Sequence, residues 1–274
     1  MRRPTERTHK PENHKLESGS AISSFKIDKL GVEVYKHRVA MGARAAEAVA
    51  EKLRSLLASG KNVRMIFAAA PSQNELLDTL VSTPGIDWSR VTAFHMDEYI
   101  GLKAGAPQSF GVFLKDKIFG KVNFGRVHYI SSNPDSTAKE CERYSSLLSE
   151  APIDIVCLGI GENGHIAFND PDVADFNDPK KVKVVRLDQK SRQQQVNDGC
   201  FASIAEVPKE AITLTIPTLI SSHYMYAVVP GKTKADAVRR TIKGEISTAC
   251  PASILRRHAN AILFLDGDSA AQIV

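Results

Sequence analysis

The sequence predicts an α/β fold of three layers, in which helices cover both faces of a mainly parallel, doubly wound sheet. Short apolar runs of strand length alternate along the chain with longer segments whose apolar residues recur at helical spacing. This alternation is typical of strand–helix–strand units with right-handed crossovers. The 274 residues, 43% of them apolar, suffice for one large domain or two small ones. Because no repeat or linker divides the chain, we expect a single domain.

The N-terminal segment differs in composition from the rest. Residues 1–16 carry a net charge of +3, out of +5 for the whole chain. No aromatic residues are interleaved with these charges and no nucleic-acid-binding motif follows, so a solvated extension is favoured over a nucleic-acid contact. We predict a disordered basic tail over residues 1–24 and a folded domain over residues 25–274.

Composition excludes several classes of protein. No apolar run approaches the roughly 20 residues that cross a bilayer, and the N-terminus lacks the apolar region of a secretory signal. The cysteines are far apart and form no C-x-x-C pair, which disfavours a zinc site or a disulfide scaffold and fits a reducing cytoplasm. They are Cys141, Cys157, Cys200 and Cys250.

The first predicted helix covers residues 39–57, which are rich in Ala, Glu, Lys and Leu, and Gly60 ends it. The apolar run 63–69 has the length of a strand. Pro71 and Ser72 then lead into a helix over residues 74–81.

The next predicted strand is the apolar run 91–95, followed by a helix over 110–118 and a strand over 127–130. Ser136 is a favourable N-cap for a helix over 136–148. The buried strand 154–158 comes next. The remaining elements are strands at 211–216, 224–229 and 261–265 and a helix at 233–242.

Residues 172–203 are polar and have little strand character, so we expect an insertion over the site. A segment of this length is often a functional lid, although a plain surface excursion fits equally well.

A glycine-rich turn follows the strand 154–158 and leads to His165 and Asp170. Its glycines match the G-x-G-x-x-G dinucleotide fingerprint, but Pro171 opposes the helix that the fingerprint should open, and no acid follows at the expected distance. We therefore expect no nucleotide cofactor. A carboxylate beside an imidazole fixes its tautomer and suits proton transfer. Alternatively, Asp170 only caps the turn.

Asp97 and Glu98 follow the strand 91–95. Adjacent residues of an extended segment point to opposite faces, so only one of the two can face a pocket, unless both are surface carboxylates. The spacing of His95, Asp97, His165 and Asp170 matches no metal motif, and the chain has no G-x-S-x-G nucleophile turn. Metal ligation is therefore not expected.

Lys234 stands at the start of the predicted helix 233–242 and is a candidate anion contact, with a solvated helix lysine as the alternative.

Residues 96–102 and 159–171 resemble the signature segments of the glucosamine-6-phosphate deaminase/isomerase family, and weaker similarity extends over about residues 40–265. The related 6-phosphogluconolactonases continue differently after the histidine. The resemblance implies cofactor-free isomerisation with deamination of a hexosamine 6-phosphate. It assigns sugar ring opening to His165, held by Asp170, and the transfer of the C2 proton to Asp97.

The resemblance also implies how the substrate is held. Lys234 matches the family's phosphate contact and Ser72 matches a threonine hydroxyl of its phosphate loop. Glu98, Gly161 and Gly164 belong to the two signature segments and complete the predicted substrate site.

The chain departs from the family pattern at several positions. Asn163 replaces an aspartate and cannot carry negative charge. Asp170 replaces a glutamate, so we expect a backbone shift or a bridging water between it and His165. The phosphate loop reads Ala-Ala-Ala-Pro at 68–71 instead of a glycine-rich run, and Arg192 lies near the family's second phosphate contact without matching it.

Two alternatives remain open at this stage: hydrolysis of a 6-phosphogluconolactone with His165 activating water, and a non-catalytic sugar-phosphate sensor. The segment before residue 24 is too short and polar for a helix-turn-helix. The sequence also leaves open whether the chains form a homo-oligomer.

Overall fold

In the described part of the chain, the main sheet has eight strands, and only the two strands at one edge of it pair in the antiparallel direction. The computed structural model describes residues 19–274, so residues 1–18 of the predicted basic tail lie outside the described residues. In spatial order the strands are β1 (Ser23–Ile27), β2 (Leu30–Tyr35), β11 (Ala261–Asp266), β10 (Tyr224–Val229), β7 (Ile155–Leu158), β3 (Val63–Phe67), β4 (Val91–His95) and β6 (Arg126–His128). All neighbours except β1 and β2 are parallel.

The strand order reverses between β3 and β7. From β3 the chain moves outward through β4 to β6, then returns to place β7 beside β3 and continues through β10 to β11 on the other side. Loops that leave two such neighbouring strands in opposite directions open a crevice at their carboxyl ends, where α/β proteins bind ligands. The topology therefore locates the candidate site before any side chain is considered.

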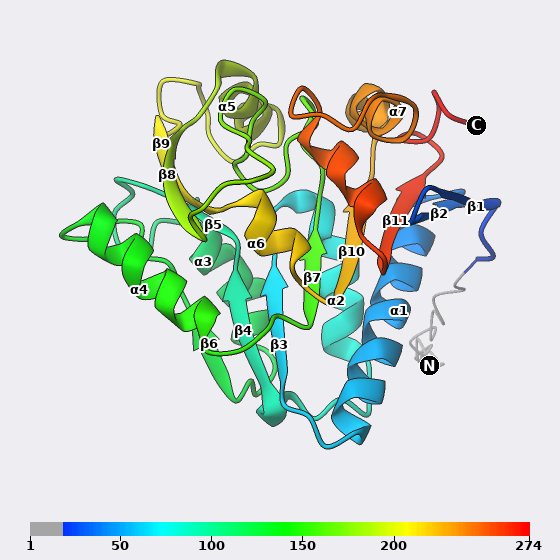
Figure 1. The fold of residues 1–274 in the computed structure, drawn as a ribbon, viewed down its shortest axis with the longest axis horizontal. Coiled ribbons are helices and arrows are strands. Elements are labelled where there is room, and N and C mark those ends of the chain that lie inside the picture. Colours follow the sequence, from blue (N-terminus) through cyan, green and yellow to red (C-terminus); the bar gives the residue numbers. More distant parts are fainter. Residues whose placement is uncertain (1–18) are drawn as a thin grey trace, which may run out of the picture.

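Helices cover both faces of this sheet, as predicted (Figure 1). The helices are α1 (Arg38–Ala58), α2 (Asn74–Ser82), α3 (Phe110–Leu114), α4 (Thr137–Ser149), α5 (Gln189–Asn197), α6 (Ile216–Ile220) and α7 (Ala235–Lys243). Two separate apolar clusters fill the space between the layers. One packs α1, α2 and α3 against the sheet and the other packs α4, α6 and α7 against its opposite face. The three-layer, single-domain prediction is confirmed.

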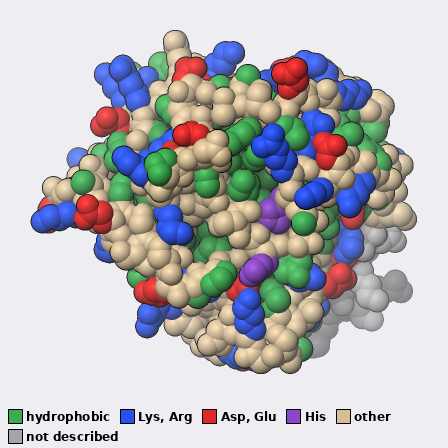
Figure 2. Space-filling model, in the orientation of Figure 1, with side chains coloured by type: hydrophobic (Ala, Val, Ile, Leu, Met, Phe, Trp, Pro, Cys, Tyr) green, Lys and Arg blue, Asp and Glu red, His purple; other side chains and the backbone are tan. Residues whose placement is uncertain are grey.

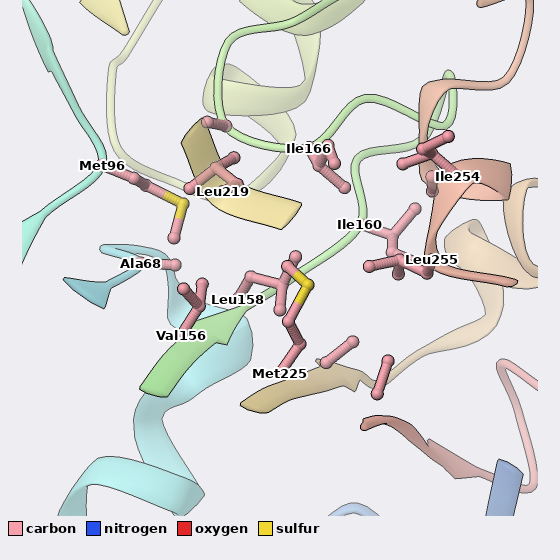
Figure 3. Close-up of a cluster of buried hydrophobic side chains, with 14 of the residues drawn as sticks. Ala68, Met96, Val156, Leu158, Ile160, Ile166, Leu219, Met225, Ile254 and Leu255 are labelled. Atoms are coloured by element: carbon pink, nitrogen blue, oxygen red, sulfur yellow. The ribbon is translucent and has the colours of Figure 1, made fainter. Parts of the chain in front are cut away.

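The second apolar cluster reaches the ends of the central strands. Figure 3 shows Val156 and Leu158 of β7 among Ala68, Met96 and Ile160, which belong to the segments that leave β3, β4 and β7. These segments begin on a close-packed apolar base. Polar side chains that follow directly after it are held on a rigid support.

A second, smaller sheet corrects part of the sequence prediction. It consists of β5 (Asp97–Tyr99), β9 (Glu210–Leu214) and β8 (Val182–Arg186), all antiparallel. The strand expected at 211–216 therefore belongs here rather than to the main sheet. Residues 172–203 have more regular structure than their little strand character indicated, because they contain β8 and α5. Short strands with polar residues lack the continuous apolar run by which the main-sheet strands were predicted.

The start of the described chain also differs from the prediction. The hairpin of β1 and β2 extends the main sheet by two strands and was not predicted. β1 begins at Ser23; the tail boundary at residue 24 stays a prediction.

The surface carries charges of both signs. On the face drawn in Figure 2, lysine and arginine side chains are interspersed with aspartate and glutamate side chains. Among residues 19–274, no helix is both long and apolar enough to cross a membrane.

Candidate active site

A cavity of about 260 Å³ lies at the carboxyl ends of β3, β4, β7 and β10. Five of the predicted site residues line it: Ser72, Asp97, Gly161, His165 and Lys234. Four segments far apart in the sequence therefore meet at the crevice that the strand order creates. The cavity wall also includes Arg38 from α1 and Gln194, Gln195 and Asp198 from the insertion, none of which was predicted to do so.

The turn after β7 holds the His165 ring against the backbone of Gly161. A β-carbon at Gly161 would lie 2.1–2.4 Å from three ring atoms of His165. Only glycine leaves room for the ring at this position. The turn is closed by hydrogen bonds from the Gly161 amide to the His165 carbonyl and from the Gly164 amide to the Gly161 carbonyl, both 2.9 Å.

Gly164 has a structural rather than a substrate-binding position. Its φ of +90° is in the left-handed region, and a β-carbon would lie 2.7 Å from Sγ of Cys250. It does not line the cavity, so the structure does not support the substrate contact predicted for it.

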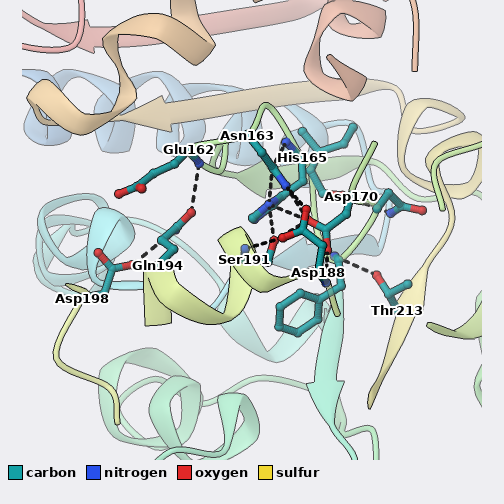
Figure 4. A network of polar contacts seen from close by, with 12 residues as sticks. Glu162, Asn163, His165, Asp170, Asp188, Ser191, Gln194, Asp198 and Thr213 are labelled. Atoms are coloured by element: carbon teal, nitrogen blue, oxygen red, sulfur yellow. Dashed lines mark hydrogen bonds and ion pairs between the residues drawn. The ribbon is translucent and has the colours of Figure 1, made fainter. Parts of the chain in front are cut away.

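One nitrogen of His165 is surrounded by acceptors (Figure 4). Nδ1 lies 3.0 Å from Oδ1 of Asp170, 2.8 Å from Oδ1 of Asn163 and 2.9 Å from Oγ of Ser191. Carboxylate and amide oxygens only accept hydrogen bonds, so the neutral ring carries its proton on Nδ1. Nε2 is then unprotonated and able to take a proton in the cavity.

His165 and Asp170 are in direct contact, so no bridging water is needed between them; the backbone shift, the other expected alternative, stays a prediction. Ala167 has a φ of +48°, and the Asn169 amide donates to the Ile166 carbonyl over 3.2 Å. The chain therefore folds back sharply between the two residues, which brings the Asp170 carboxylate to the His165 ring.

Asp170 is buried yet remains ionised. Burial alone would raise its pKa, but hydrogen bonds from His165, Asn163 and Ser191 lower the pKa of Asp170 to about 2. Asn163 donates from Nδ2 to Oδ1 of Asp170 and to Oδ2 of Asp188, each over 2.9 Å. Asn163 thus contacts both the His165 ring and the Asp170 carboxylate, and it lies beside His165 as predicted.

The insertion supplies part of this network. Asp188 is the N-cap of α5: its carboxylate accepts from the Ser191 amide over 2.7 Å, and its own amide donates to Oδ2 of Asp170 over 3.2 Å. Ser191 donates its hydroxyl proton to Asp170. The insertion therefore holds the His165 ring and also contributes to the cavity wall. No sequence motif indicated Ser191.

Asp97 lies in very different surroundings. It begins β5, where it is opposite Thr213 of β9, and it lines the cavity with only 7% of its surface exposed. Among residues 19–274, no donor bonds to its carboxylate. Burial, and then the charge of neighbouring Glu98, raise the pKa of Asp97 well above its usual value. A carboxylate with a raised pKa at a cavity wall is suited to accept a proton.

His95 fixes the backbone at Asp97. Its Nδ1 donates to the Asp97 carbonyl over 2.8 Å, and its Nε2 accepts from the Ile130 amide over 2.9 Å. This pair of bonds requires the neutral ring, and burial lowers the pKa of His95 to about 4.

Glu98 points away from the cavity, as expected for a neighbour of Asp97 in an extended segment. Its carboxylate accepts from Oγ of Ser109 over 2.6 Å and from the amides of Phe110 and Gly111 over 3.1 and 3.0 Å, at the start of α3. It therefore anchors β5 to α3. The substrate-binding role predicted for Glu98 does not agree with this position.

Lys234 and Ser72, the predicted phosphate contacts, both line the cavity. Lys234 is 6% exposed, and in the described part of the chain its ammonium has no ion-pair partner. Burial lowers its pKa, partly offset by Asp198 and Glu162. Ser72 belongs to the turn Pro71–Gln73, which follows β3. Arg192, by contrast, donates to the Ile204 and Val207 carbonyls and does not line the cavity.

The described residues contain no group of three or more His, Cys, Asp or Glu side chains that could hold a metal ion. The site consists instead of an unpartnered acid, an oriented histidine–aspartate pair and a buried ammonium. Fold and site together define an α/β protein with the groups for proton transfer on an anionic small molecule.

Comparison with known proteins identifies the family. Residues 36–264 match the family described as glucosamine-6-phosphate isomerases/6-phosphogluconolactonase, and the chain belongs to this family. It is 34% identical to the glucosamine-6-phosphate deaminase of an Exiguobacterium species over 234 residues, which cover 85% of this chain and 90% of that one. With the Bacillus cereus glucosamine-6-phosphate deaminase it shares 35% identity over 67% of this chain and 68% of the relative.

Solved structures give the same result for the fold. A monomeric glucosamine-6-phosphate deaminase superposes with a TM-score of 0.81 at 30% identity, covering 88% of this chain and 99% of that one. The 6-phosphogluconolactonase of Thermotoga maritima superposes with a TM-score of 0.71 at 20% identity, covering 87% and 100%. The lactonase resemblance shows the shared fold alone, and the family predicted from the two signature segments is confirmed.

Proposed function

We propose that this chain converts glucosamine 6-phosphate, or a close relative such as galactosamine 6-phosphate, into the ketose 6-phosphate and ammonia. The observation that carries the proposal is the placement of Asp97, His165 and Lys234 around one cavity. The deaminases of Exiguobacterium and Bacillus cereus, at 34% and 35% identity, support the same reaction class.

His165 performs the first step. Its unprotonated Nε2 accepts the proton of the sugar's C1 hydroxyl and returns a proton to the ring oxygen, so the ring opens to the aldehyde. The imidazolium that forms transiently is stabilised by the Asp170 carboxylate 3.0 Å from Nδ1. Asp170, with a pKa of about 2, stays ionised throughout.

Asp97 performs the second step. Its carboxylate removes the proton from C2, next to the aldehyde, and delivers it to C1, so that an enolic intermediate becomes the ketose skeleton. The amino group then leaves from C2 as ammonia and water supplies the ketone oxygen. Because proton removal beside a carbonyl needs a base with a pKa near the working pH, the raised pKa of Asp97 supports this role.

Lys234 holds the substrate phosphate. An ammonium buried without a carboxylate partner is stabilised when a phosphate dianion enters, and the charge-assisted hydrogen bond fixes the sugar's orientation. Ser72 supplies a hydroxyl on the same wall. A cytoplasmic location accords with the four free cysteines in the described residues.

A direct assay tests the proposal. The purified chain is offered glucosamine 6-phosphate, galactosamine 6-phosphate and 6-phosphogluconolactone separately, while ammonia and acid release are both followed. We expect ammonia and a ketose 6-phosphate from an amino sugar phosphate. Acid release from the lactone without ammonia from either amino sugar would replace the proposal with the hydrolase alternative, and no turnover of any of the three would favour the sensor.

A further inference from the structure

Arg38 lines the active-site cavity and has no role in the reaction described so far. It is the first residue of α1, before the segment in which the sequence predicted a helix. Its guanidinium is held on two sides. Nε donates to Oε1 of Glu75 over 2.6 Å, and Nη2 donates to the Pro71 carbonyl. In the described residues Nη1 makes no hydrogen bond, so one edge of the group remains available for a ligand.

The close contact between α1 and α2 allows Arg38 to be held at the cavity wall. Gly42 lies one turn after Arg38 on α1, and a β-carbon there would lie 2.3 Å from the β-carbon of Glu75. Glycine therefore allows α2 to approach closely enough for the Glu75 carboxylate to reach Arg38. Both partners of Arg38, Pro71 and Glu75, flank Ser72, which also lines the cavity.

The charges around the cavity leave a phosphate dianion short of positive partners. Of the two lysines that line the cavity, Lys234 is buried and Lys232 is exposed, and Asp198 contributes a negative charge on the same wall. Residues 68–70 are alanines, and Pro71 has no amide hydrogen to donate. A second cation, held in place by the protein, would give the phosphate dianion two charge-assisted contacts instead of one.

We propose that Arg38 is the second phosphate-binding cation of this cavity, together with Lys234, and that the pair sets the preference for phosphorylated over unphosphorylated sugars. The identity of the sugar rests on the proposed function, but the phosphate contact does not. Because guanidinium edges match phosphate oxygens in geometry, an arginine fixed by two protein acceptors is preorganised for this contact.

Inorganic phosphate is the probe that tests the contact without turnover. Calorimetric titration of the wild type, Arg38→Gln, Glu75→Gln and Arg44→Gln gives the dissociation constants. Arg44 is the matched control, since it lies on α1 and pairs with Glu47 at the surface. We expect Arg38→Gln to weaken phosphate binding by about tenfold or more, the range of one lost charge-assisted contact, and Arg44→Gln to change it less than about twofold.

Glu75→Gln separates a phosphate contact from a merely structural ion pair. It breaks the same link between α1 and α2 but keeps the arginine, so phosphate affinity should fall by no more than about threefold even if the melting temperature drops. Equal losses of affinity in Glu75→Gln and Arg38→Gln would overturn the proposal, as would unchanged affinity in Arg38→Gln or a wild type that binds no phosphate at millimolar concentration.

Kinetics extend the test to the substrate. Arg38→Gln should raise KM for the hexosamine 6-phosphate by about tenfold or more with kcat within about threefold, while kcat/KM for unphosphorylated glucosamine stays unchanged. A fall in kcat at constant KM would contradict a binding role. If the wild type produced no ammonia while Arg38→Gln still lost phosphate affinity, the proposed function would fail and the phosphate contact would stand.

Discussion

The two aspartates that serve the cavity are both buried, yet their surroundings have opposite electrostatic effects. Asp97 is 7% exposed and Asp170 1%. No donor among the described residues contacts the Asp97 carboxylate, and its pKa is raised by burial. Asp170 accepts hydrogen bonds from Asn163, Ser191 and the Asp188 amide besides its contact with His165, and its pKa falls to about 2.

This difference supports the roles proposed for the two aspartates. A carboxylate that is costly to ionise can exchange protons with a substrate, whereas one held ionised by donors can only orient and stabilise its partner. Under the proposed function, the two buried acids therefore differ in role: Asp97 is the base and Asp170 orients His165. Variants of each acid should change activity and stability in different combinations.

Asp97→Asn is expected to have the largest effect on turnover. The amide cannot take the C2 proton, so kcat should fall by about 10³-fold, within the range for a lost general base. Phosphate affinity should stay near that of the wild type, because Lys234 is untouched. Asp78→Asn, on the surface of α2 with a pairing to Lys117, is the charge-matched control. Near-normal turnover in Asp97→Asn would exclude Asp97 as the base.

The same variant should stabilise the fold. A folded-state pKa above the unfolded value means that ionised Asp97 destabilises the native state as pH rises through that pKa. Removing the charge should therefore raise Tm at neutral pH by about 2–4 °C, the shift that 1 kcal/mol causes in a chain of this size. Calorimetry measures this shift, and a fall in Tm would contradict the unpartnered state of the carboxylate.

Asp170→Asn is expected to lower both the turnover rate and the stability of the fold. Loss of the anion beside Nδ1 removes the stabilisation of the imidazolium, so kcat should fall by about 10²-fold. Stability should fall by about 2 kcal/mol, the scale of charge-assisted hydrogen bonds. Because the folded pKa is depressed, this stability difference is present above the ordinary value of 3.8 and closes as pH falls through about 2. A variant as stable as the wild type at pH 7 would contradict the hydrogen-bond network.

The sequence predicted those parts of the molecule that depend on local pattern. The strands predicted at 63–69, 91–95, 154–158, 224–229 and 261–265 are mainly apolar segments of strand length, and each corresponds to a strand of the main sheet. The glycine turn with His165 and the strand end with Asp97 were found in the same way, because their residue types follow directly on such strands.

What the sequence could not predict depends on contacts between distant segments. Arg38 pairs with Glu75 across 37 positions, and Ser191 contacts His165 across 26. The strands β5 and β8 are short and carry charged residues, and they form only because β9 pairs with both. Likewise, the positive φ at Ala167 brings Asp170 to His165. An alanine in the sequence does not indicate a positive φ, so this turn could not be predicted.

Ser191→Ala probes the contribution of the insertion to the His165–Asp170 pair and should have the smallest effect. Asn163 and Asp170 still hold Nδ1 of His165 when the hydroxyl is removed, so one hydrogen bond of about 1 kcal/mol is lost, roughly fivefold in kcat/KM. The acid limb of kcat/KM should stay in place, because Asp97, with its raised pKa, sets it rather than Asp170. Ser203→Ala, in the same insertion but bonded only to Glu206, should leave rate and pH profile unchanged. If Ser191→Ala behaved like Ser203→Ala, the insertion would cover the site without orienting its histidine.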